Sequence, residues 1–317
     1  MEIKKLGNTG ISVSRLAIGT LTMSPFQRGL STEAGAEVIL AALDKNVNFI
    51  DTAQMYGSYN QVSMALSQWK GEKPVVSTKS IAGTAQLMES AIEEFRKVMN
   101  IDIIDIFLMH AVKDENAFIQ RKPAFDVLLA AKAKGVIRAV GASTHSVKTT
   151  AYLSSISELD IIHPIINMAG IGNIDGTRDE MLSNIARAVK SGKGIYAMKP
   201  MGGGHLRHEA SEALKWISSI SNIHSVCVGM TSKSEVEMNC SIFNGLDVTV
   251  EFEKKIAAQE RKLFVNEALC VACGKCVELC QQNALKIIDK KLQINESNCI
   301  LCGYCAKDCP TFAIRVI

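Results

Sequence analysis

Hydrophobic and polar positions follow two alternating periods along most of the chain. Short runs rich in aliphatic residues, such as RLAIGT (15–20) and NFIDTA (48–53), are each followed by a longer stretch whose apolar residues lie three or four positions apart, such as STEAGAEVILAALDKN (31–46). The first pattern predicts a buried strand and the second an amphipathic helix. Eight such strand–helix pairs follow one another between Arg15 and Asn244.

This repeat predicts an α/β fold, a (β/α)8 TIM barrel, rather than a doubly wound sheet. A dinucleotide-binding sheet would carry a GxGxxG turn after its first strand, and RLAIGT is not followed by one. The glycine-rich MGGGH (201–205) follows the seventh strand instead, where barrels often bind phosphate. The segment before Arg15, with its GNTG turn, predicts a small hairpin at the barrel floor.

Eight of the ten cysteines lie near the C-terminus in two runs, each with the spacing CxxCxxCxxxC. This is the spacing of bacterial ferredoxins that bind two [4Fe-4S] clusters, in which the fourth cysteine of each run crosses to the other cluster. Zinc is the alternative, but zinc sites usually pair CxxC knuckles across a longer loop. The crossing rule predicts two ligand sets: Cys270, Cys273, Cys276 and Cys309 for one cluster, and Cys299, Cys302, Cys305 and Cys280 for the other.

The two cysteine runs repeat at an interval of 29 residues, which also relates Asn266 to Asn295. The repeat predicts two copies of one half-domain in a small α+β ferredoxin-like unit. The charged stretch before this unit, VTVEFEKKIAAQERKLF, predicts a linking helix. We therefore predict three parts: a barrel over 1–247, a linking helix over 248–264 and a two-cluster ferredoxin domain over 265–317.

The overall charge excludes a general electrostatic partner. The net charge is +3, and the 35 basic and 32 acidic residues are interspersed, so no nucleic-acid partner is expected. No run of about 18 uncharged apolar residues occurs, and the N-terminus lacks signal-peptide features, so we expect no membrane partner and a cytoplasmic location. The ferredoxin-like part is nearly neutral, which predicts that it docks on its own barrel. Cys227 and Cys240, outside the runs, are expected to be buried hydrophobic residues.

Four polar residues end or follow successive predicted strands, where the chemistry of a TIM barrel is located. Asp51 and Tyr56 lie in DTAQMYG, Lys79 ends VVSTKS and His110 ends DIFLMH. This ordered set resembles the catalytic tetrad of the aldo-keto reductase superfamily, and the resemblance covers roughly residues 1–245. It implies an oxidoreductase that reduces a small-molecule carbonyl compound or oxidises an alcohol.

The resemblance also implies a role for each member of the tetrad. Tyr56 would donate the proton, although a tyrosine with its ordinary pKa near 10 is a weak acid. We expect the Lys79 ammonium to lower the pKa of Tyr56, and Asp51 to hold Lys79 in place. His110 would bind and orient the substrate carbonyl.

The cofactor side departs from the family pattern. Where family members clamp the nicotinamide with a Ser-Asn pair and a glutamine, this chain has Ser143, Thr144 and His163. Met198 takes the place of a stacking aromatic residue, and Glu235 lies where an arginine would bind the 2′-phosphate of NADP. Because a carboxylate repels phosphate, NAD(P) binding is expected to favour NADH over NADPH.

A phosphate group of the cofactor has a second candidate site. Lys199 lies beside MGGGH, with the backbone amides of Thr231 and Ser232 expected opposite, and either NADH or FMN would fit such a site. A cluster transfers single electrons and a nicotinamide a hydride, whereas flavin can exchange electrons singly or in pairs. Two functions therefore stay open: an iron-sulfur carbonyl reductase, or an electron-transfer protein whose barrel binds FMN and links the clusters to a ferredoxin-type or other redox partner.

Overall fold

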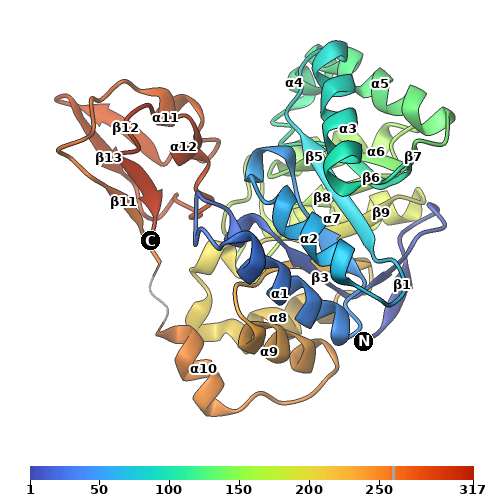
Figure 1. The fold of residues 1–317 in the computed structure, drawn as a ribbon. Coiled ribbons are helices and arrows are strands. Elements are labelled where there is room, and N and C mark those ends of the chain that lie inside the picture. Colours follow the sequence, from blue (N-terminus) through green and yellow to red (C-terminus); the bar gives the residue numbers. More distant parts are fainter. Residues whose placement is uncertain (259–260) are drawn as a thin grey trace.

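The computed structural model describes residues 1–258 and 261–317, and its main part is a closed barrel of parallel strands (Figure 1). The strands pair in sequence order, and the last pairs with the first. They are β3 (Leu16–Gly19), β4 (Phe49–Asp51), β5 (Val75–Ser80), β6 (Ile104–Met109), β7 (Ile137–Thr144), β8 (Ile161–Pro164), β9 (Gly194–Met198) and β10 (Ser225–Gly229). The predicted (β/α)8 barrel is confirmed.

Helices cover the outside of the barrel between successive strands. They are α1 (Thr32–Asp44), α2 (Tyr59–Gln68), α3 (Ala85–Met99), α4 (Glu115–Gln120), α5 (Lys122–Ala133), α6 (Val147–Ser155), α7 (Arg178–Lys190), α8 (Ala210–Ser219) and α9 (Lys233–Phe243). Several begin at a Ser, Thr or Asp whose side chain accepts from a backbone amide of the first turn, and at α7 Thr177 and Glu180 form a reciprocal capping box. The fourth unit has two helices because the chain breaks at Arg121, before Pro123 in the first turn of α5.

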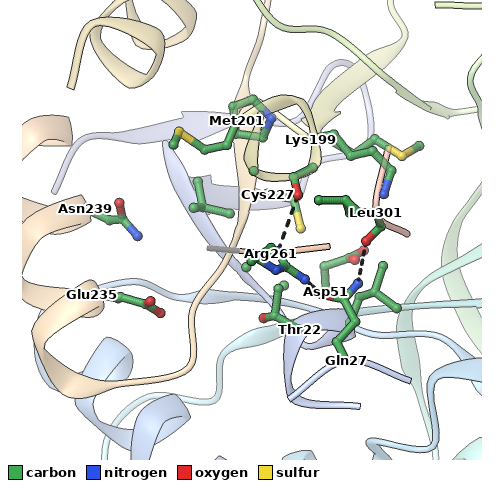
Figure 2. A pocket seen from close by; sticks show the side chains of 18 of the residues that line it. Thr22, Gln27, Asp51, Lys199, Met201, Cys227, Glu235, Asn239, Arg261 and Leu301 are labelled. Carbon is green, nitrogen blue, oxygen red and sulfur yellow. Dashed lines mark hydrogen bonds between the residues drawn. The ribbon is translucent and has the colours of Figure 1, made fainter. Parts of the chain in front are cut away.

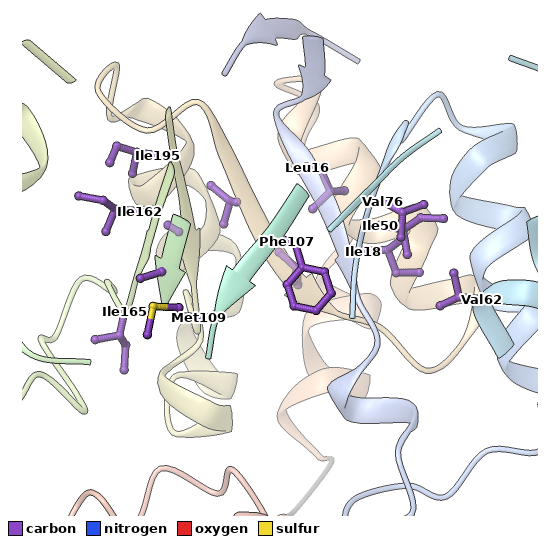
Figure 3. Packing of buried hydrophobic residues seen from close by; sticks show 14 of the residues in the cluster. Leu16, Ile18, Ile50, Val62, Val76, Phe107, Met109, Ile162, Ile165 and Ile195 are labelled. Atoms are coloured by element: carbon purple, nitrogen blue, oxygen red, sulfur yellow. The ribbon is translucent and has the colours of Figure 1, made fainter. Parts of the chain in front are cut away.

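Two layers of apolar side chains hold the barrel together. The outer layer packs strands against helices, and Figure 3 shows Leu16, Ile18 and Phe107 within it. Burying a side chain of this size contributes about 1.5–3 kcal/mol. The inner layer fills the barrel, and its floor is closed by the antiparallel pair β1 (Ile3–Lys5) and β2 (Ser12–Ser14), as the hairpin prediction states.

The C-terminal part forms a separate small unit with two antiparallel strand pairs (Figure 1). Its elements are β11 (Leu263–Val265), α11 (Lys275–Glu278), β12 (Leu285–Ile288), β13 (Lys291–Ile294), α12 (Tyr304–Lys307) and β14 (Ile314–Val316). The 29-residue repeat extends to the backbone, since Ala272 and Leu301 both have positive φ, as do Gly274 and Gly303. Helix α10 (Val250–Ala257) precedes this unit.

Four short 3-10 helices lie in loops of the barrel. They are η1 (Leu21–Met23), η2 (Gln54–Tyr56), η3 (Gly202–Gly204) and η4 (Arg207–Glu209). Within residues 1–258 and 261–317, no helix combines the length and the apolar content needed to cross a bilayer.

Candidate active site

The structure brings the four residues of the predicted tetrad together at the C-terminal ends of β4, β5 and β6. The Lys79 Nζ donates to both carboxylate oxygens of Asp51, each at 2.8 Å, and to the carbonyl of Thr52 at 2.8 Å. Only 1% of the Lys79 side chain and 3% of the Asp51 side chain are exposed. The rings of Tyr56 and His110 meet edge to face, with their centres 5.5 Å apart. The catalytic roles of these residues stay predictions.

The Asp51 carboxylate is held by further groups that the sequence did not identify. Tyr196, fully buried on β9, donates its hydroxyl to Asp51 at 3.0 Å and shares a second hydrogen bond with Ser77 at 2.8 Å. The Cys227 thiol on β10 is close to this carboxylate, and burial followed by Asp51 raises the pKa of the thiol. Because a buried charge is costly unless it is paired and hydrogen-bonded, these contacts keep Asp51 in one position.

Burial raises the pKa of Tyr56 well above its ordinary value of 10, and the nearby Tyr304 and Asp51 raise it further. Tyr56 consequently stays protonated, as a proton donor must. The Lys79 Nζ lies 5.1 Å from the centre of the Tyr56 ring and is paired with Asp51. That Lys79 lowers this pKa stays a prediction.

The histidines of the site are neutral at physiological pH. Burial, followed by the Lys79 ammonium, lowers the pKa of His110 well below 6.5. Burial lowers the pKa of His163 to about 4, and its ring stacks on Tyr196 with the centres 3.8 Å apart. The His163 Nδ1 donates to the Tyr196 carbonyl at 2.6 Å, so its Nε2 carries a lone pair. Neither imidazole therefore adds a positive charge to the site.

A pocket opens beside the tetrad and is lined from both the barrel and the small unit. Asp51, Tyr56 and three of the seven predicted cofactor residues border it: His163, Met198 and Lys199. Figure 2 shows Lys199, Cys227 and Glu235 around it, with Arg261 and Leu301 from the C-terminal region. The sequence did not point to Arg261, which donates to the Gly203 carbonyl at 3.4 Å and to the side chain of Gln27.

The other four predicted cofactor residues do not border this pocket in the part of the chain that the structure describes. The Ser143 hydroxyl accepts from the amide of Ala111 at 2.9 Å, and the Thr144 hydroxyl accepts from the amide of Ser146 at 3.0 Å. Both side chains are buried and hold the loop ends after β6 and β7. Their part in cofactor binding stays a prediction.

The other two, Thr231 and Ser232, lie immediately before α9, with Ser232 as its N-cap, and both form hydrogen bonds with Glu235. Its carboxylate accepts from the Thr231 amide at 2.6 Å and from the Thr231 hydroxyl at 3.1 Å, while the Ser232 hydroxyl accepts from the Glu235 amide at 3.2 Å. A phosphate at the Thr231 amide would have to displace this carboxylate and would be repelled by it. The cations Lys199, Arg207 and Arg261 line the pocket, and of these Lys199 and Arg261 are the better candidates for binding a phosphate.

The glycine-rich loop after β9 contacts the small unit. A Cβ added to Gly203, whose φ is +77°, would lie 2.0 Å from the carbonyl oxygen of Ile300. Nearby, the His205 Nε2 donates to the carbonyl of Cys299 at 2.6 Å. The glycine-rich loop, for which the sequence predicted phosphate binding, therefore packs against the second cysteine run; we call it the seat of the cluster unit.

A second set of contacts ties the small unit to the loop after β3. The Gln27 side chain donates to the carbonyls of Leu301 and Cys302 at 3.4 Å and 3.2 Å. The docking expected from the near-neutral charge is thus present, and the loop that carries Cys299 and Cys302 lies against the pocket.

The cysteines surround two cavities in the small unit, and each cavity has the composition that the crossing rule predicts. Backbone amides donate to two of the sulfurs at equivalent positions of the repeat, from Ala284 to Cys280 and from Ala313 to Cys309, each at 3.3 Å. Four thiolates around a cavity are the ligands that a cubane cluster requires. The first cavity is lined by Cys270, Cys273, Cys276 and Cys309, and the second by Cys280, Cys299, Cys302 and Cys305.

Comparison with known families agrees with this geometry. The model of the aldo/keto reductase family matches residues 15–215. The chain belongs to this family. A second model, described as a 4Fe-4S dicluster domain, matches residues 249–313. Both resemblances seen in the sequence are confirmed, and they place the chain among oxidoreductases with iron-sulfur clusters.

Individual relatives are distant. Aldo-keto reductase YhdN of Bacillus subtilis is 28% identical over 53% of this chain and 54% of its own length, so the chain spans about half of that relative. The NADH-specific methylglyoxal reductase of Escherichia coli is 31% identical over 50% of this chain and 56% of its own. The solved aldo-keto reductase of Bacillus halodurans, in its holo form, superposes with a TM-score of 0.64 at 17% identity, over 81% of this chain and 95% of the other, which shows the shared fold.

Proposed function

We propose that this protein reduces a small-molecule carbonyl compound, or oxidises the corresponding alcohol, with Tyr56 as the proton donor and two [4Fe-4S] clusters for electron transfer. The observation that carries the proposal is the convergence of Tyr56, His110 and the Lys79–Asp51 pair. Tyr56 and Asp51 of this group line a pocket that Leu301 and Tyr304 of the second cysteine run also line. A protonated phenol and a neutral imidazole are both able to hydrogen-bond to a carbonyl oxygen. Tyr56 then transfers its proton to the developing alkoxide, while His110 orients the oxygen.

The Lys79–Asp51 pair would act through Tyr56. Loss of the Tyr56 proton creates a phenolate in a buried site, which costs free energy unless a cation lies close by. The Lys79 ammonium is the cation on the same side of the barrel, with its Nζ 5.1 Å from the centre of the Tyr56 ring. Asp51 and the Thr52 carbonyl prevent Lys79 from turning away.

A nicotinamide cofactor fits the pocket and would supply the hydride. Lys199 and Arg261 present positive charge to the pocket. Burial lowers the pKa of both, so an anionic phosphate nearby would stabilise their charged forms. Met198 and His163 line the pocket and would border the nicotinamide end. The His163 ring stacks on Tyr196, whose hydroxyl hydrogen-bonds to Asp51. The Glu235 carboxylate at the Thr231 amide favours NADH over NADPH, and a relative is named for NADH specificity.

The two clusters are proposed to act in series. The carbonyls of Cys299 and Cys302 accept hydrogen bonds from the barrel, so the second cluster would lie next to the pocket. Cys273, a ligand of the first cluster, is exposed. Two electrons from a ferredoxin-type or other redox partner would therefore enter one at a time at the first cluster and pass to the second. In the pocket they would, together with one proton, return the oxidised nicotinamide to the reduced form that supplies the hydride.

This adjacency also favours the second candidate function, an electron-transfer protein whose barrel binds FMN. A bound flavin could exchange single electrons with the adjacent cluster, which a nicotinamide does poorly. The two candidate functions are distinguished by the small molecules that are released when anaerobically purified protein is denatured. Release of flavin supports the second candidate, and its absence supports the first.

The decisive test replaces Tyr56 with phenylalanine. Because a positioned proton donor contributes about 10²–10⁴-fold to rate, Tyr56→Phe is expected to lower kcat for NADH-dependent reduction of methylglyoxal by at least about 100-fold, with the visible absorbance of the clusters unchanged. Tyr59→Phe is the matched control, since Tyr59 is buried on the same side of the barrel and its hydroxyl hydrogen-bonds to Thr78 at 2.7 Å. Undiminished turnover in Tyr56→Phe would refute the assignment.

A further inference from the structure

A tyrosine of the small unit reaches into the tetrad. Tyr304 begins α12, between Gly303 and the predicted cluster ligand Cys305. Its hydroxyl lies 3.1 Å from the Nε2 of His110, and it is close enough to Tyr56 to raise the pKa of that residue. Its ring meets the His110 ring edge to face, with the centres 5.8 Å apart. One oxygen atom of the small unit therefore contacts the histidine that would orient a substrate oxygen, next to the proton donor.

This position is the one that the proposed reaction requires for the substrate. A carbonyl oxygen that accepts a proton from Tyr56 while His110 orients it must lie within hydrogen-bond distance of both. The Tyr304 oxygen already lies at that distance from the Nε2 of His110, with Tyr56 beside it. Two oxygens cannot occupy one position, so a substrate oxygen binds only after the Tyr304 hydroxyl has moved away.

We propose that Tyr304 is the gate of the active site, an internal ligand that the substrate oxygen must displace. The inference rests on the proposed function, because it takes Tyr56 and His110 to be the groups that meet the substrate oxygen. The gate belongs to the second cluster loop, since Tyr304 lies between the predicted ligands Cys302 and Cys305. Substrate binding in the barrel is consequently coupled to the redox state of the second cluster. The coupling free energy is the same in both directions.

The internal repeat shows that a cluster loop does not itself require a tyrosine here. Lys275 is the counterpart of Tyr304 in the first loop, and it likewise follows a glycine with positive φ and precedes a cysteine. The two glycines differ in their surroundings: a Cβ on Gly303 would lie 2.9 Å from the carbonyl oxygen of Phe26 in the barrel. The tyrosine therefore occurs in the loop that approaches the barrel, where its hydroxyl has a partner.

Steady-state kinetics test the gate. Tyr304→Phe keeps the ring but loses the hydrogen bond between the Tyr304 hydroxyl and His110. More of the enzyme is then open, and the KM for methylglyoxal is expected to fall about tenfold. Lys275→Ala, the matched change in the first loop, is expected to leave that KM as in the wild type. A higher KM or a lower kcat/KM in Tyr304→Phe would overturn the proposal, because Tyr304 would then assist the substrate rather than compete with it.

A binding experiment tests the same arrangement without turnover. Tyr304→Ala leaves a space of the shape of a phenol, with Tyr56 and His110 at its polar end, and such a space can bind a small ligand of the same shape. Calorimetry is expected to show p-cresol binding to Tyr304→Ala, and none to the wild type or Lys275→Ala. Equal binding to all three proteins, or binding to none, would overturn the gate. If p-cresol binds only Tyr304→Ala while the wild type reduces no carbonyl compound, the proposed function is wrong. The conclusion that the Tyr304 side chain occupies the ligand site beside His110 would still hold.

Discussion

Replacing Gly203 with alanine tests whether the loop after β9 serves as the seat of the cluster unit. Gly203 has a φ of +77°, and an added Cβ would lie 2.0 Å from the carbonyl oxygen of Ile300. An ordinary contact begins at 3.4 Å, so Ile300 would have to recede by about 1.4 Å. Ile300 lies between two predicted ligands of the second cluster, and the whole loop would move with it.

The movement acts on the hydrogen bonds that hold this loop to the barrel. His205 binds the carbonyl of Cys299 at 2.6 Å, and Gln27 binds those of Leu301 and Cys302 at 3.4 Å and 3.2 Å. A hydrogen bond contributes about 1 kcal/mol net. Losing two or three of them would weaken docking by about 2–3 kcal/mol, a change of about 30-fold to 140-fold in the ratio of docked to undocked protein.

Small-angle X-ray scattering under anaerobic conditions measures the result. Gly203→Ala is expected to increase the radius of gyration and to speed protease cleavage between the barrel and the cluster unit. Gly10→Ala is the matched control, because Gly10 has a φ of +72° but no described atom within 4 Å of its added Cβ. It carries only the backbone cost of about 1 kcal/mol. Equal scattering and equal cleavage rates in the two variants would refute the claim that this loop seats the cluster unit. If Gly203→Ala instead binds NADH more weakly without undocking, the loop after β9 binds a phosphate of the cofactor.

Two further predictions concern buried charge. Asp51→Asn leaves the Lys79 ammonium unpaired and should lower the free energy of unfolding by about 3–5 kcal/mol. Adding Lys79→Met removes the unpaired charge and should restore most of this loss. Equal thermal midpoints of the wild type and Asp51→Asn would contradict this prediction. Burial lowers the pKa of His110, that of His145 to about 3 and that of His163 to about 4. Below pH 6.5 the unfolded chain gains protons that the folded chain does not, so stability is lost from pH 6.5 down to about 4 for His163 and down to about 3 for His145. His145→Gln should flatten the pH dependence of the thermal midpoint, and an unaltered slope would count against a neutral His145.

Much of the fold could be predicted because its signals are local. Eight apolar runs separated by amphipathic stretches indicate a barrel, since each strand and helix shows its own period. The split of the fourth helical stretch at Arg121 was missed, although Pro123 marks a possible helix start. The cysteine sets were also predictable, because a cluster imposes a fixed spacing on its ligand loop.

The electrostatics of the tetrad could not be predicted in the same way. Motif order indicated that Asp51, Tyr56 and Lys79 belong together, but the direction of the Tyr56 pKa depends on burial and on how completely Asp51 neutralises Lys79. Tyr196 is a comparable case. Its position on a strand was predictable, whereas its hydrogen bond to Asp51, across the barrel interior, was not.

The amino-acid pattern alone indicated a TIM barrel joined to a two-cluster ferredoxin unit, and it predicted the residues that each part would use for chemistry. Only the tertiary structure decided how the parts meet: that Gly203 seats the second cluster loop and that Tyr304 reaches the tetrad. The physical reason lies in sequence distance. Strand periods and ligand spacings extend over a few residues and leave a pattern, whereas the contact of Tyr304 with His110 joins positions 194 apart and exists only after the two domains dock.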